Sequence, residues 1–307
     1  PGTPGRFHQL CDRRLREKKE MRSNALCVVL IVCVMMCVAT TSNFAATSAP
    51  ATSMTNGLAE PADPQLVLGN ESCVKCHAPE IKVWKQTPHA RTFDELHRRP
   101  EAKQIASKLG LSSIKNEGRC VSCHYTQQSK TPGDVHVIAG VSCESCHGGA
   151  KNWLDLHQDY GGESITRLTE SPEHRHQRIA ASVASGMRNP TNVYSVAQSC
   201  LRCHTTGDEE LVNVGGHSAG SLDFEFVSWS QGMIRHNFVR TDGKSNVVSS
   251  PERTRVMCVA GMIAELEASL RATAKATQKA TYGVTVAKRG ARAGARLKSV
   301  VAKVDSE

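Results

Sequence analysis

A five-residue unit, Cys-x-x-Cys-His, occurs four times in this chain of 307 residues, and it constrains the fold more than any other feature. The copies read CVKCH, CVSCH, CESCH and CLRCH and begin at positions 73, 120, 143 and 200. Their unequal spacing excludes a regular repeat array. They contain eight of the 13 cysteines, and three of the others lie in an apolar run, so we expect no structural disulfides.

Pairs of cysteines two residues apart occur in two kinds of site. In c-type cytochromes both thiols bind haem covalently and the following His ligates the iron, whereas in structural zinc sites the cysteines are metal ligands. Zinc sites do not require a His after every pair, and His makes up only 13 of 307 residues, so four such His are not expected by chance. We therefore predict four covalently attached haem c groups. The predicted attachment points are Cys73, Cys76, Cys120, Cys123, Cys143, Cys146, Cys200 and Cys203, and the predicted proximal iron ligands are His77, His124, His147 and His204.

Four haems also account for the composition. Aromatic residues make up only 4% of the chain, and large flat porphyrins can supply apolar core that the side chains lack. We predict a mainly α, haem-packed multihaem cytochrome c with little β structure and a C-terminal helical extension. The predicted organisation is a signal-peptide region at 1–50, a tetrahaem cytochrome domain at 51–250 and a basic helical extension at 251–307.

The N-terminal region has the layout of a secretory signal. A basic segment precedes the apolar run ALCVVLIVCVMMCVA at 25–39, and a stretch of small residues follows it. Fifteen apolar residues are fewer than the roughly 20 that a membrane span needs, so we predict export, to the periplasm or its equivalent, with an uncleaved membrane anchor as the alternative. Met21 stands where a signal of usual length would begin, which leaves open a mis-annotated start upstream of it.

The formal charge of +9 is concentrated at the two ends of the chain. Residues 1–49 contain seven basic and three acidic groups, and residues 271–307 contain nine basic and two acidic groups. A basic tail favours an acidic partner or an anionic membrane surface. We expect redox proteins as partners, association of the tail with a membrane surface as a second option, and no nucleic acid.

A ligand on the second face of each iron decides between electron transfer and small-molecule binding. Outside the motifs, position favours four His residues as these distal ligands. His89 follows a helix turn in TPHA, His157 lies too close to His147 to share its iron, His217 follows two glycines, and His236 lies in MIRHNF. His97 and His174 lie among charged residues and are expected to be solvated, and His136 is ambiguous.

Several segments resemble the tetrahaem cytochrome c-554 family of nitrogen-cycle bacteria. They are ESCVKCHAPEIKVWKQTPHA, EAKQIASKL, CVSCH, GVSCESCHGG with a His ten residues later, and CLRCH, which together cover about residues 70–205. The resemblance implies a mostly helical fold with haems in close pairs. It implies that His89 and His157 are distal ligands to other haems and that His236, with His217 as competitor, is a third.

The resemblance also implies an electron carrier. Its donor could be an octahaem hydroxylamine-oxidising enzyme and its acceptor a membrane quinone or cytochrome system. In the family's type member the haem of the second motif, here at His124, lacks a sixth protein ligand. This chain departs from the pattern with GGA after the third motif, with His136 and the loop GGHSAG, and with its basic tail. The added His217 or His136 could close the second iron, which puts the open site in doubt. Two alternatives to the electron carrier remain: an oxidoreductase of a small nitrogen compound at an open second haem, and a membrane-tethered electron conduit.

Overall fold

The computed structural model describes residues 60–304, and within this range the protein is mainly helical, as predicted. The predicted signal region and membrane anchor, at residues 1–50, lie outside the described residues. None of the described helices is long and apolar enough to cross a membrane.

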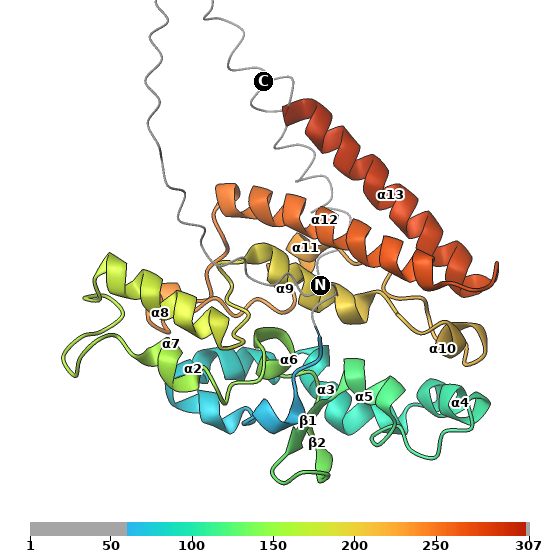
Figure 1. The fold of residues 1–307 in the computed structure, drawn as a ribbon, viewed down its shortest axis with the longest axis horizontal. Helices are drawn as coiled ribbons and strands as arrows, with labels where there is room; N and C mark the ends of the chain where they lie inside the picture. Colours follow the sequence, from blue (N-terminus) through green and yellow to red (C-terminus); the bar gives the residue numbers. More distant parts are fainter. Residues whose placement is uncertain (1–59, 305–307) are drawn as a thin grey trace, which may run out of the picture. The chain divides into compact units, whose positions relative to one another are not determined.

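The described elements are short helices, one small hairpin and two long C-terminal helices (Figure 1). In chain order they are η1 (Pro64–Leu66), α2 (Glu71–Trp84), α3 (Pro88–Glu95), η2 (Leu96–Arg98), α4 (Pro100–Lys108), α5 (Gly118–His124), β1 (Thr126–Ser129), β2 (Val135–Ala139), α6 (Cys143–His147), α7 (Leu154–Gln158), α8 (Pro172–Ala184), α9 (Val193–His204), α10 (Glu209–Asn213), α11 (Phe226–Ser230), η3 (Val239–Thr241), α12 (Pro251–Lys275) and α13 (Thr281–Val304).

Each Cys-x-x-Cys-His unit lies on a helix, and its His lies where that helix ends or bends. The motif His is the last residue of α5, α6 and α9. In α2 it is His77, whose backbone is not helical (φ −118°, ψ 33°), two residues before Pro79. A proline inside a helix removes a hydrogen bond and kinks the chain. One helical turn therefore carries both thiols of a motif, and the bend that follows turns the imidazole away from the helix.

The two strands β1 and β2 form an antiparallel hairpin. The hairpin connects the second motif on α5 to the third motif on α6. Thr126 at the start of β1 is buried, and its hydroxyl hydrogen-bonds the carbonyl oxygen of Gly140 (2.7 Å) and the hydroxyl of Ser145 in α6 (2.8 Å). These bonds hold the third motif helix against the hairpin.

The C-terminal helices α12 and α13 pack on each other and on the helix of the fourth motif. Ala264 and Ala268 of α12 lie in one buried cluster with Ala197 and Leu201 of α9. All four side chains are fully buried. The predicted boundary at 250 coincides with the start of α12, and residues 251–304 share their core with the motif-bearing part of the chain.

Cys258, in α12, is disulfide-bonded, so the prediction of no structural disulfides is wrong. Cysteines outside the motifs have no diagnostic spacing, and a pairing that depends on tertiary contact cannot be read from their positions. None of the eight motif cysteines forms a disulfide.

Candidate haem-binding sites

The structure brings each motif His close to one of the four His residues predicted as distal ligands. The ring centroids are 6.4 Å apart for His77 and His157, 6.1 Å for His204 and His89, 6.2 Å for His124 and His217, and 6.3 Å for His147 and His236. Each pair joins residues from distant parts of the sequence.

The common distance has a simple geometric meaning. A His nitrogen lies about 2 Å from the metal that it binds, so two imidazoles on opposite sides of one metal have centroids about 6 Å apart. Direct stacking of the rings does not explain the four pairs, because their interplanar angles range from 21° to 88°. The geometry fits a metal between the two rings, with a pair of thiols beside one of them as c-type haem requires. A structural zinc site would instead take four protein ligands.

Hydrogen bonds orient most of these imidazoles through Nδ1. An imidazole whose Nδ1–H is donated to an oxygen has its lone pair on Nε2, which is then the metal-binding atom. The Nδ1 partners are the carbonyl oxygens of Arg188 for His147 (3.2 Å), Ser218 for His217 (2.7 Å), Ile234 for His236 (2.7 Å) and Leu154 for His157, and the hydroxyl of Ser221 for His204 (2.8 Å).

Burial keeps most of these imidazoles neutral, which is the form that binds metals. Desolvation lowers the pKa of His124, His147 and His204 to about 4. It also lowers the pKa of His89. His77 differs, because the neighbouring Glu80 carboxylate, 3.8 Å from its Nδ1, raises its pKa.

Thiols of different motifs lie in contact. The thiols of Cys73 and Cys143 are close neighbours, as are those of Cys123 and Cys203. Helix α6, which carries Cys146 and the third motif, packs against α9, which carries Cys203 and the fourth. The motifs therefore adjoin one another in the order first, third, fourth, second.

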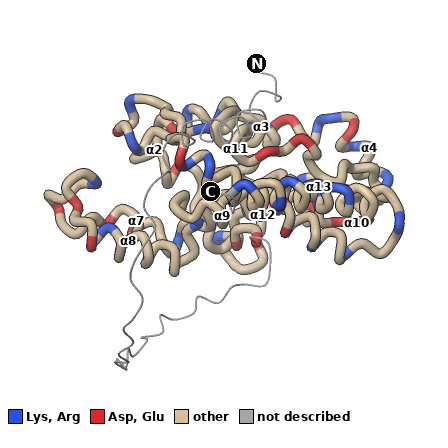
Figure 2. The backbone as a smooth tube through the Cα atoms, turned by 90° about the horizontal axis from the view of Figure 1, so that it is seen from above, with Lys and Arg blue, Asp and Glu red and all other residues tan. Residues whose placement is uncertain are grey.

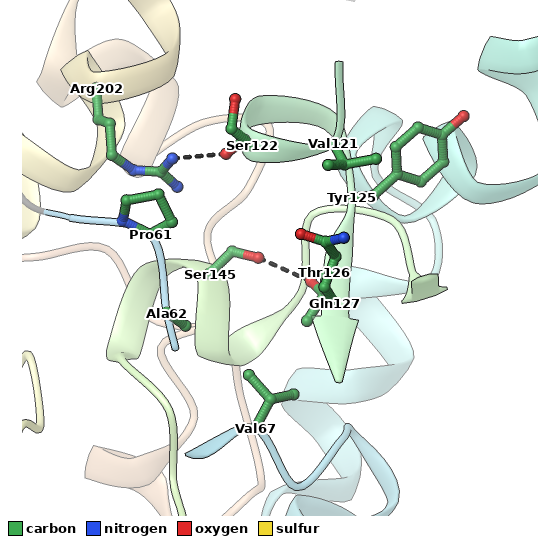
Figure 3. Close-up of a pocket in the computed structure, with 10 residues that line it drawn as sticks. All are labelled: Pro61, Ala62, Val67, Val121, Ser122, Tyr125, Thr126, Gln127, Ser145 and Arg202. Atoms are coloured by element: carbon green, nitrogen blue, oxygen red, sulfur yellow. Dashed lines mark hydrogen bonds between the residues drawn. The ribbon is translucent and has the colours of Figure 1, made fainter. Parts of the chain in front are cut away.

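Three arginines support the ends of the motif helices, where backbone carbonyls lack helical partners. Arg202 of α9 donates to the carbonyl oxygen of Ser122 in α5 (2.6 Å), beside a small hollow lined by residues of α5, α6 and α9 (Figure 3). Arg188 donates to the carbonyl oxygen of Cys146 (2.9 Å), and Arg289 of α13 donates to that of His204 (2.7 Å). The sequence analysis missed these arginines, although Arg202 lies inside the fourth motif.

Several buried donors near the His pairs have no hydrogen-bond partner among the described residues. They are Trp153 Nε1, Arg202 Nε, Arg235 Nε and Arg289 Nη2. Trp153 packs edge-on against His157, with centroids 5.2 Å apart, and Arg235 directly precedes His236. Buried donors are normally satisfied. The carboxylates of haem would supply acceptors of the right chemistry, so the donor set fits the cofactor.

The remaining His residues lie outside the pairs. His174 hydrogen-bonds Glu170 through Nδ1 (2.8 Å), and His136 is exposed on β2 near Asp134. His97 was expected to be solvated, but its Nδ1 is buried. The residue as a whole is half-buried, so the rest of the side chain stays partly in contact with solvent.

Comparison with known proteins identifies the region around the first three motifs. Residues 72–148 match the family described as cytochrome c554 and c-prime. Cytochrome c-554 of Nitrosomonas europaea is 33% identical over 104 residues. This part of the chain is similar to the cytochrome c-554 family. Members of this family are c-type cytochromes, in which haem c is bound covalently.

The match to the Nitrosomonas protein covers 30% of this chain and 43% of that cytochrome c-554. The family match ends just after the third motif, so the fourth motif, His217, His236 and the helices α12 and α13 lie beyond it. No solved structure matches the chain.

Proposed function

We propose that this protein is an exported tetrahaem c-type cytochrome that carries electrons between redox partners. The observation that carries the proposal is the pairing of every motif His with a second His at a separation of 6.1–6.4 Å. A haem iron with imidazole on both faces has no open position for substrate, and such centres suit electron transfer. On this reading His77, His124, His147 and His204 are the proximal ligands of the four irons and His157, His217, His236 and His89 are their respective distal ligands.

The alternative, an enzyme acting on a small nitrogen compound, requires an open iron at the second motif. His217 lies opposite His124 at a centroid distance of 6.2 Å, in the position of a sixth ligand. His136, the other candidate, is exposed on the hairpin instead. The electron-carrier reading is therefore the better supported of the two.

The contacts between motif thiols support a route for the electrons. In a haem-loaded protein these sulfurs would be the thioethers that attach the haems, so contact between two motifs would bring two haems close together. We infer electron transfer in the order first, third, fourth, second haem. The supporting neighbours are Cys73 with Cys143, helix α6 with helix α9, and Cys203 with Cys123. The first and second haems would then be the terminal sites for donor and acceptor.

Export and the identity of the partners rest on the sequence. The secretory layout of residues 1–50 supports a periplasmic location, and the relationship to cytochrome c-554 suggests nitrogen or respiratory metabolism, with a multihaem oxidoreductase as donor and a membrane electron-transfer component as acceptor. Basic residues along α13, including the exposed Lys288, Arg292 and Lys298, suit a transient contact with an acidic partner or membrane surface (Figure 2).

Two measurements test the proposal. The mass of the intact protein should exceed that of the mature polypeptide by four haem groups, and the electron paramagnetic resonance (EPR) spectrum of the ferric protein should show low-spin signals only. Fewer than four haems would overturn it. So would a high-spin signal in the ferric protein together with binding of carbon monoxide or nitric oxide by the reduced protein. Sequencing of the mature N-terminus separates a cleaved signal from a retained anchor.

A further inference from the structure

His217 is carried by a short segment that packs against the two C-terminal helices. We propose that the hairpin formed by α12 and α13 positions His217 as the sixth ligand of the second iron. The C-terminal extension would thereby decide that this iron is closed. The inference rests on the proposed function, in which His124 and His217 share an iron, and it assigns a role to residues 251–304.

The position of His217 follows that of α10. The amide of His217 donates to the carbonyl oxygen of Leu211 (3.1 Å), and the amide of Gly216 donates to that of Val212 (3.1 Å), so His217 lies on the turn that closes the helix. Gly216 has a φ of +82°, which favours glycine, and a Cβ on Gly215 would lie 2.5 Å from the carbonyl oxygen of Leu211. A turn so closely constrained moves with α10 as a unit.

Both ends of α10 are hydrogen-bonded to the hairpin. The carboxylate of Glu209, the first residue of α10, accepts from the amide (2.9 Å) and hydroxyl (2.7 Å) of Thr277 and from the amide of Gln278 (3.1 Å), in the loop that joins α12 to α13. The side-chain oxygen of Asn213, its last residue, accepts from the amide of Tyr282 in the first turn of α13 (2.9 Å). In Figure 1, α10 lies beside the loop between the two long helices.

Apolar contacts hold the chain on both sides of His217. Val212 precedes it and Ala219 follows it, and both lie in one buried cluster with Ala272 of α12 and Tyr282 and Val286 of α13. Tyr282 and Val286 are completely buried. The imidazole between these two anchor points cannot move far without disrupting the cluster.

The opposite side of α10 is tied to the second motif. Arg119, in the same helix as His124, forms ion pairs with Asp208 (3.1 Å) and Glu210. The segment that carries His217 is therefore held between α5, which bears the proximal ligand, and the hairpin. The loop and the tail are also two of the features by which this sequence departs from the cytochrome c-554 pattern, and the structure shows them packed together.

The test weakens the hairpin contacts of α10 without changing any haem ligand. A Glu209→Ala/Asn213→Ala double variant removes the hydrogen bonds at both ends of α10. Glu267→Ala is the matched control, because that carboxylate accepts from Tyr194 and Gln198 and joins α12 to α9 instead. His217→Ala defines the spectrum of an open second iron. Each haem-loaded protein is measured by ferric EPR and by titration of the reduced form with carbon monoxide.

We expect the wild type and Glu267→Ala to bind no carbon monoxide, and His217→Ala to bind one equivalent per molecule. The double variant should bind a substantial fraction of one equivalent and show a matching high-spin signal. Free imidazole should restore the low-spin signal of the double variant. A double variant with the wild-type spectrum beside an open His217→Ala protein would refute the positioning role of the hairpin alone. An open iron in the wild type, or an unchanged spectrum in His217→Ala, would instead refute the proposed His124 and His217 pairing. If the double variant does not incorporate haem, Asn213→Ala alone is read by the same criteria.

Discussion

Replacing Glu144 by Gln should destabilise the protein strongly. Glu144 lies between the two cysteines of the third motif and is only 1% exposed. Its Oε1 accepts from the amides of Leu68 (2.8 Å) and Ala150 (2.8 Å), and its Oε2 accepts from the amide of Gly69 (2.7 Å). One side chain thus joins the segment that leads into the first motif helix to the third motif and to the chain that follows it.

The magnitude follows from these three bonds. A glutamine has one acceptor oxygen, which can retain the two bonds of Oε1, while its amide group would face the N–H of Gly69. Loss of a hydrogen bond to a charged acceptor, with a buried N–H left unsatisfied, costs about 2–3 kcal/mol. The two remaining bonds weaken by about 1 kcal/mol each once the charge is gone. The neutral side chain is easier to bury, so we expect a net loss of about 2–4 kcal/mol.

The assay is reversible chemical or thermal unfolding of the haem-loaded protein, followed by circular dichroism. At about 2–4 °C per kcal/mol for a chain of this size, the midpoint temperature should fall by about 10 °C. Glu163→Gln, which makes the same change at an exposed site, should alter the free energy of unfolding by less than about 0.5 kcal/mol. A loss below about 1 kcal/mol for Glu144→Gln would refute the reasoning, because it would mean that the three backbone amides find other acceptors.

Three further changes test other contacts. Arg289→Met should lower the free energy of unfolding by about 2–3 kcal/mol, since it removes the closer of the two arginines that pair with the buried Glu265 carboxylate of α12 and leaves only Arg296, 3.6 Å away. On the proposed function it should also lower the reduction potential of the haem at the fourth motif, because a positive charge is lost beside that motif. An unchanged potential in a spectroelectrochemical titration would contradict this. Gly140→Ala places a methyl group 2.3 Å from the carbonyl oxygen of His89. It should therefore displace that ligand and add a high-spin EPR signal, and a wild-type spectrum would count against the pairing. The guanidinium of Arg178 lowers the pKa of Glu170 to about 2, below its value of about 4.3 in the unfolded chain. The stabilisation is therefore present above about pH 4 and is lost as the pH falls through 2. The difference in unfolding free energy between wild type and Glu170→Gln should shrink over that range, and a difference independent of pH would disprove the assignment.

The helical class and the motif sites were predictable because both depend on local sequence. The spacing of Cys-x-x-Cys-His places two thiols and an imidazole on one helical turn in any context, and the helices at 251–275 and 281–304 follow from composition and capping. The four distal candidates could be selected because each lies at a turn, after glycines or at a fixed distance from a motif.

The partner of each distal His could not be read from the sequence. His217 reaches His124 because α10 lies between α5 and the C-terminal hairpin, and each of those contacts joins residues far apart in the chain. The same holds for Arg289. In the sequence it is one of many basic residues of the tail, and only the fold shows that it is buried and donates to the carbonyl oxygen of His204. The cofactor chemistry is thus encoded in five-residue units. The coordination of each iron is a property of the packed chain, because it depends on distances between helices that local sequence does not set.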